Sequence, residues 1–165
     1  MSRYSTPAGT PAAIVNKLSE ELAKVVRSPD IARKLADEFG LLLFFDEVQT
    51  GAGRTGELFA YQTYGVAPDV MAVAKGFGGG FPVGACLATE KAAKAMTYGS
   101  HGSTFGGNAL TCAVASAVIR FILENDILAS VNRVGERLRE KLARLPLVTE
   151  VRGEGLLIAA ELAQD

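Results

Sequence analysis

Apolar residues recur along the chain with two spacings, one typical of amphipathic helices and one typical of short buried strands. The helical spacing covers residues 10–27, roughly 30–38, 58–64, 91–96, about 108–124 and 126–145. Short apolar runs bounded by glycine or proline predict strands at residues 41–45, 70–74, 84–90, 147–151 and 156–162. Because helices alternate with apolar strands, we expect an α/β fold.

The run LLLFF at residues 41–45 differs from the other strands because it leads directly into two acids, Asp46 and Glu47. The chain then turns through GAGRTG at residues 51–56. The apolar run predicts a buried strand, which by itself has no use for paired negative charge. We expect Glu47 and Arg54 to pair with each other or to face solvent in the turn. Since no strand is predicted just before it, this strand or its neighbour should expose an unpaired apolar edge.

Two nucleotide-binding interpretations fit this segment poorly. An apolar strand ending in an acid is typical of P-loop NTPases, but the sequence has no G-x-x-x-x-G-K-[ST] loop to hold phosphates. The glycines of GAGRTG match G-x-G-x-x-G, yet the dinucleotide fingerprint places its first glycine directly at the strand end. Here Asp46 and Glu47 intervene, and their charge would repel phosphates.

A third interpretation joins the ends of two strands with a distant loop. Asp46 follows the first strand, Lys75 follows the next, and Ser103 and Thr104 lie in a glycine-rich loop. The carboxyl ends of strands in an open α/β sheet meet at one crevice. There a lysine can form a Schiff base with pyridoxal phosphate (PLP), an acid can pair with the ring nitrogen, and hydroxyls can bind the phosphate. These residues therefore favour a PLP site, and Asp46 alone could otherwise cap the turn.

Three longer motifs make this interpretation specific: FFDEVQTGAGRTG, PDVMAVAKGFGGGFPVGA and GSHGSTFGGNALTCA. Over about residues 35–162 the chain resembles the class III (ω-amino acid) aminotransferases, most of all their acetylornithine and succinylornithine branch. The resemblance implies part of the large domain of a fold type I PLP-dependent transferase at residues 39–125. It also implies an interdomain helix and the start of the small C-terminal domain at residues 126–165.

The resemblance also implies roles for individual residues. Lys75 would carry the cofactor as a Schiff base and shuttle the proton, and Asp46 would pair with the pyridinium nitrogen. Val48 would pack against the ring, and Gln49 would hydrogen-bond near its phenolic oxygen. The hydroxyl pair Ser103–Thr104 would bind the cofactor phosphate of the neighbouring subunit, which implies a homodimer. The implied reaction moves an amino group from an ornithine-like donor to 2-oxoglutarate, as in arginine biosynthesis.

The first part of the chain departs from this pattern. Residues 7–37 are similar to the C-terminal helices of periplasmic tricarboxylate-type solute receptors, so residues 1–38 are expected to contain two unrelated helices. The sequence also offers no counterpart of the upstream phosphate loop, the ring-stacking aromatic residue or the substrate-carboxylate arginine of the aminotransferases. We therefore expect a fragment or chimera with an incomplete site. The alternatives are a non-catalytic remnant that folds or dimerises without cofactor, and a solute-binding module.

Composition removes other classes of function. The 17 basic and 18 acidic residues give a net charge of −1, with no basic stripe for nucleic acid. No apolar run approaches the roughly 18 residues of a membrane span, and residues 1–9 show no secretory signal, so a cytoplasmic protein is expected. Cys86 and Cys112 have no metal-ligand spacing and are expected to be buried, reduced thiols. No metal site is expected, and His101 is expected as a positioned polar residue.

Overall fold

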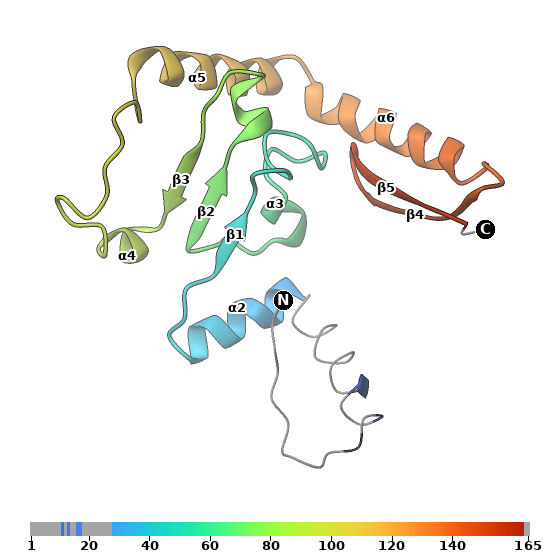
Figure 1. Cartoon of the computed structure of the whole chain (residues 1–165), viewed down its shortest axis with the longest axis horizontal. Coiled ribbons are helices and arrows are strands. Elements are labelled where there is room, and N and C mark those ends of the chain that lie inside the picture. Colours follow the sequence, from blue (N-terminus) through green and yellow to red (C-terminus); the bar gives the residue numbers. More distant parts are fainter. Residues whose placement is uncertain (1–10, 12, 14–15, 18–27, 164–165) are drawn as a thin grey trace. The chain divides into compact units, whose positions relative to one another are not determined.

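The computed structural model describes residues 11, 13, 16–17 and 28–163 (Figure 1). The chain divides into two compact units, Met1–Leu43 and Phe44–Asp165. Apart from residues 11, 13, 16 and 17, the helix expected over residues 10–27 lies outside the described residues. The expected domain boundaries after residues 38 and 125 stay predictions.

In the first unit, α2 spans Pro29–Glu38, which confirms the helix expected over about residues 30–38. Proline suits the first turn, because its missing N–H would have no acceptor within the helix. The helix ends at Phe39, whose N–H donates to the Leu35 carbonyl, and Gly40 follows with a φ of +64°. A glycine in the left-handed region is a common way to end a helix.

The second unit contains a three-stranded sheet in the order β1-β2-β3, formed by Phe44–Asp46, Val70–Val73 and Ala85–Ala88. β1 and β2 run parallel, and β3 runs antiparallel to β2. The central strand is the most buried, since Met71 is 5% and Val73 is 2% exposed. Helices alternate with these strands along the chain (Figure 1), which confirms the α/β class.

The prediction of a buried strand at residues 41–45 is wrong. Only Phe44–Asp46 forms β1, and Leu41, Leu42 and Phe44 are all more than half exposed. The reason is that β1 pairs with β2 alone among the described strands and so forms an edge of the sheet. Parallel strands are usually covered on both sides, and uncovered apolar residues follow when they are not. The expected unpaired apolar edge is therefore present at β1.

The helices of the second unit follow the expected pattern of short elements and two long ones. Their bounds are Tyr61–Tyr64 for α3, Glu90–Ala93 for α4, Ala109–Glu124 for α5 and Ile127–Leu142 for α6, with a 3₁₀ turn, η1, at Lys75–Gly78. Asn108 caps α5, because its side-chain oxygen accepts the Thr111 N–H at 2.9 Å. No helix of the described residues is long and apolar enough to cross a membrane.

The cysteines are free thiols as expected, but the prediction that they are buried is wrong. Cys86 on β3 and Cys112 on α5 are both exposed. β3 is the other outer strand of the described sheet and pairs with β2 alone, so no described strand lies on its second side. Cys112 lines an open groove of about 690 Å³ beside α5, which no described residue fills. The described residues contain no cluster of acids, histidines and cysteines suited to a metal ion.

An antiparallel hairpin, β4 at Val148–Glu154 and β5 at Leu157–Leu162, packs against α6. Its turn is fastened to the glycine-rich turn after β1, because the Leu156 N–H donates to the Arg54 carbonyl at 2.9 Å. From α6, the Asn132 side-chain amide donates to the Gly56 carbonyl at 3.1 Å. Three segments distant in sequence therefore meet at this point. Gly135 of α6 lies so close to the Gly155 carbonyl that a Cβ would overlap it.

We predict that Gly135→Ala destabilises the protein, although alanine is normally the better helix former. The added methyl group would collide with the hairpin backbone, and overpacking of this kind costs roughly 1–3 kcal/mol. Urea unfolding measures the effect, and Glu136→Ala at an exposed position of the same helix is the matched control. A Gly135→Ala protein as stable as the control would contradict the packing described between α6 and the hairpin.

Candidate active site

The parallel pairing of β1 and β2 brings two candidate residues to the same end of the sheet. Asp46, the last residue of β1, is opposite Ala72 of β2, and the Glu47 N–H donates to the Ala72 carbonyl at 2.9 Å. Lys75 follows β2 after one further residue, Ala74. Parallel strands have their carboxyl ends on the same side of the sheet. Asp46 and Lys75 therefore both lie at the carboxyl ends of the strands.

Lys75 has a strained backbone. It begins η1 with a φ of +48°, in the left-handed region that residues with a Cβ seldom adopt. Such a conformation costs about 1–2 kcal/mol for a residue other than glycine. The Phe77 N–H closes the turn on the Ala74 carbonyl at 3.0 Å, so local hydrogen bonding holds the strained residue in place. The Lys75 side chain is exposed, and strain retained at such a lysine is typical of a functional position.

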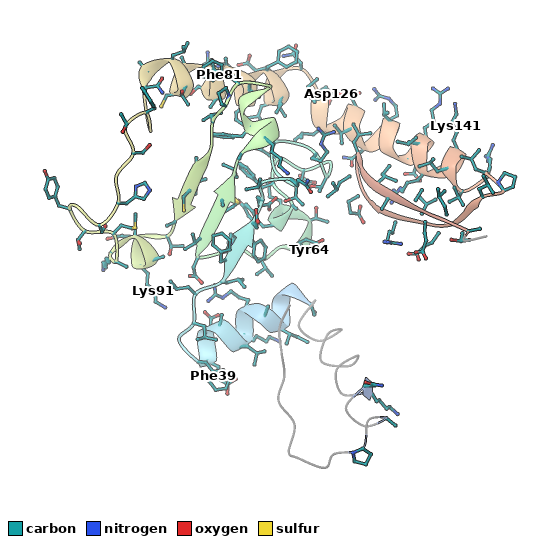
Figure 2. The ribbon with its side chains drawn as sticks, in the orientation of Figure 1. Phe39, Tyr64, Phe81, Lys91, Asp126 and Lys141 are labelled. Atoms are coloured by element: carbon teal, nitrogen blue, oxygen red, sulfur yellow. The ribbon has the colours of Figure 1, made fainter. Side chains whose placement is uncertain are left out.

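A hollow of about 320 Å³ contains Lys75. Its lining is Gln49, Gly51, Ala52, Arg54, Lys75, Gly76, Leu156 and Leu157. A second, wider hollow of about 650 Å³ shares Ala52, Arg54, Lys75 and Gly76 and continues along the loop Gly79–Val83. That loop includes Phe81, which Figure 2 labels. Both volumes fall in the range of small-molecule sites, about 300–1,000 Å³.

The predicted site residues divide into those that line the hollow with Lys75 and those that do not. Gln49 lines it. Asp46 and Val48 adjoin it along the chain, and an Asp46 carboxylate oxygen accepts the Val48 N–H at 3.1 Å. Ser103 and Thr104 line none of these hollows and lie exposed in the loop before α5, where the Ser103 hydroxyl accepts the Gly106 N–H at 3.0 Å.

Of the eight lining residues, sequence reasoning named only Gln49 and Lys75 as site residues, and its main omissions are Arg54, Leu156 and Leu157. Arg54 was expected only to solvate the turn or to pair with Glu47, yet its side chain is at the hollow, and Glu47 is almost fully buried at 2% exposure. Leu156 and Leu157 were expected only as strand residues, and they line the hollow because the hairpin turn is bonded to Arg54. The glycines Gly153 and Gly155, just before Leu156, were the available signal, since Gly155 packs against the backbone of residues 54–56.

The described residues fit a PLP-type cofactor in their donor set and in the space around it. The hollow offers an amine at Lys75 and a side-chain amide at Gln49, with the Asp46 carboxylate at the same edge of the sheet. Two glycines, Gly51 and Gly76, belong to its lining. At Gly51 a Cβ would lie 2.8 Å from the Glu47 carbonyl oxygen and 3.2 Å from the Phe59 ring, so no side chain can occupy that position without movement.

A sequence model of the aminotransferase class-III family matches residues 24–165. The acetylornithine aminotransferase of Agrobacterium fabrum is 56% identical over 133 residues, 78% of this chain and 33% of that protein. The acetylornithine aminotransferase of Corynebacterium efficiens is 46% identical over 164 residues, 97% of this chain and 40% of that protein. The ornithine aminotransferase of Toxoplasma gondii, solved with partial occupancy of PLP at its active site, superposes with a TM-score of 0.76 at 34% identity.

These matches have a definite extent. The superposition covers 81% of this chain and 33% of the Toxoplasma enzyme, so the chain spans about a third of the length of such relatives. The family match begins at residue 24 and therefore includes part of the segment that resembled solute receptors. That receptor resemblance stays a prediction. The fold type I relationship of the region from the sheet to the hairpin is confirmed by the solved aminotransferases.

The strain at Lys75 makes a direct prediction about stability. Lys75→Gly should be more stable than Lys75→Ala by about 1 kcal/mol, because glycine adopts a φ of +48° without the cost that a Cβ brings. At an ordinary position the order is reversed, since glycine loses about 0.5–1 kcal/mol relative to alanine. Urea unfolding of the two variants measures the difference. Greater stability of the alanine variant would show that Lys75 is not held in the left-handed region.

Proposed function

Since the chain belongs to the class-III aminotransferase family, we propose that it forms the lysine-bearing part of a PLP-dependent aminotransferase site. The proposed reaction transfers an amino group from an ornithine-like donor, of the acetylornithine type, to 2-oxoglutarate, in arginine biosynthesis. The main support is Lys75, a strained lysine that lines a ligand-sized hollow at the edge of the sheet where Asp46 also ends its strand. The acetylornithine aminotransferases among the relatives support the donor class.

Each residue has a definite task in this proposal. PLP, when bound, supplies an electrophilic aldehyde and a ring that accepts electrons. Lys75 would hold the cofactor through its Nζ atom and, once displaced by the substrate amine, would carry a proton between the substrate carbon and the cofactor. The Asp46 carboxylate keeps the ring nitrogen protonated by a charge-assisted hydrogen bond. Gln49 donates near the phenolic oxygen, and Val48 packs against the ring. Leu156 and Leu157 add apolar surface to the lining of the hollow.

The partners of the site are part of the same proposal. Ser103 and Thr104 bind the cofactor phosphate of a second subunit, so the enzyme is a homodimer with shared sites. Their exposure in the loop before α5, away from the hollow of their own chain, is compatible with that task. The substrates are a small amino donor and a 2-oxo acid, not nucleic acid or membrane, and the protein acts in the cytoplasm.

We further propose that this chain does not complete the site alone, because its sequence offers no counterpart of the phosphate loop, the stacking aromatic residue or the carboxylate-binding arginine expected upstream or downstream. The exposed apolar residues at β1, such as Phe44 at 55% exposure, favour one alternative. In that alternative the chain is a remnant or chimera that folds or dimerises without binding cofactor.

Covalent labelling separates the two. The purified chain is mixed with PLP, reduced with borohydride and mapped by mass spectrometry. The expected result is one dominant adduct at Lys75, which disappears in Lys75→Ala and persists in Lys94→Ala, a change at an exposed lysine. Adducts scattered over surface lysines, with no preference for Lys75, would refute cofactor binding and support the remnant.

The proposed role of Asp46 gives a second prediction. Asp46→Asn keeps the shape of the side chain but removes the charge that holds the ring nitrogen protonated. Because hydrogen bonds to charged groups contribute about 1.5–3 kcal/mol, we expect the PLP concentration for half-maximal labelling of Lys75 to rise by about tenfold or more. Glu57→Gln, at an exposed acid in the same segment, should leave that concentration unchanged. Equal values for wild type and Asp46→Asn would exclude the pairing.

A further inference from the structure

We infer that Glu47 is a positioning residue of this site, whose buried carboxylate fixes the turn that brings Gln49 and Arg54 to the hollow containing Lys75. The inference rests on the proposed function for its effect on the cofactor. Its effect on the turn can be measured without cofactor. Glu47 itself does not line the hollow, so it acts through the residues that it holds.

The burial of Glu47 requires compensation. Its side chain is 2% exposed and is the largest fully buried side chain among the described residues. A buried carboxylate is strongly unfavourable unless hydrogen bonds replace its hydration. Three donors do so here. The Thr50 hydroxyl and the Ala60 N–H, at 3.0 Å, donate to Oε2, and the Tyr61 N–H, at 2.8 Å, donates to Oε1.

Hydrogen bonds of Glu47 hold both ends of the segment between β1 and α3 in place. The main chain of Glu47 is fastened to β2, the strand that leads to Lys75, through the bond to Ala72. Its side chain is fastened to the start of α3 at Ala60 and Tyr61. The residues between these two points form the turn, and three of them line the hollow with Gln49: Gly51, Ala52 and Arg54.

The turn itself has little freedom while these bonds are present. The Gly51 N–H donates to the Glu47 carbonyl at 2.9 Å, and a side chain at Gly51 would collide with that carbonyl. Thr50, Ala60 and Tyr61, which bind the carboxylate, are absent from the lining of the hollow that contains Gln49. The carboxylate therefore contacts only the supports of the turn, and its loss should reach Lys75 through the turn residues that line the hollow, among them Gln49 and Arg54.

Glutamine is the informative substitution because it has the same shape but only one acceptor atom. The Ala60 and Tyr61 N–H groups donate to different oxygens of the carboxylate. A glutamine amide presents an NH₂ group in place of one oxygen, so Glu47→Gln must leave one of these N–H groups without an acceptor. Thr50→Val is a milder second variant, since it removes one donor and keeps both backbone bonds.

The first measurement is the PLP concentration for half-maximal, borohydride-fixed labelling of Lys75. Loss of a bond to a charged acceptor should raise it about tenfold in Glu47→Gln, and less in Thr50→Val. Gln49→Ala should raise it in the wild-type background but add nothing in the Glu47→Gln background, because Gln49 is already displaced. Glu57→Gln is the matched control. Independent, additive effects of Glu47→Gln and Gln49→Ala would overturn the inference.

The second measurement uses no cofactor. Trypsin cleavage after Arg54 should be about tenfold faster in Glu47→Gln, by the same loss of one bond, while cleavage after the exposed Lys94 keeps its rate. Equal rates after Arg54 in both proteins would overturn the inference. Faster cleavage after Arg54 in Glu47→Gln, combined with no labelling of Lys75 in wild type, would refute the proposed function. It would still support the inference that Glu47 fixes the turn. If Glu47→Gln does not fold, Thr50→Val decides by the same two measurements.

Discussion

The parallel pairing of β1 with β2 is the constraint on which the rest of the site depends. It brings the carboxyl ends of the two strands side by side, so that Asp46 and Lys75 can bind a single ligand. The pairing continues one residue beyond β1 through the bond from the Glu47 N–H to Ala72. An antiparallel pairing would move the acid to the other end of the strands, and a register shift by one residue would turn it to the opposite face of the sheet.

Around this pair of strands, the site is assembled from segments that have no local reason to meet. The glycine-rich turn after β1, the strained turn at Lys75 and the hairpin turn at Leu156 each contribute part of one wall. Close backbone contacts hold them together, above all at Gly155, where even a methyl group would collide with residues 54–56. The hydrogen bond from the Phe77 N–H to the Ala74 carbonyl closes the turn in which Lys75 adopts its left-handed conformation. Strained residues of this kind are common at functional sites.

The sequence was informative wherever local physics decides the structure. The spacing of apolar residues predicted α2, α5 and α6, because each helix buries one face. The motifs also predicted that Asp46 and Lys75 follow neighbouring strands. The sequence was misleading for Leu41 and Leu42. Their apolar character predicted burial, although no described strand covers them. Nothing in the sequence indicated that Leu156 and Leu157 line the hollow, and facing solvent was one of the two expectations for Glu47, which is buried instead. Both outcomes depend on contacts between distant segments.

The central claim is that the carboxylate of Asp46 and the amine of Lys75 act on opposite parts of the same cofactor ring. The most direct measurement is a crystal structure of the chain after reduction with borohydride in the presence of PLP. We expect the cofactor on the Lys75 Nζ atom, with its ring nitrogen about 2.7–2.9 Å from an Asp46 carboxylate oxygen. A ring bound to Lys75 with its nitrogen directed away from Asp46 would contradict the account.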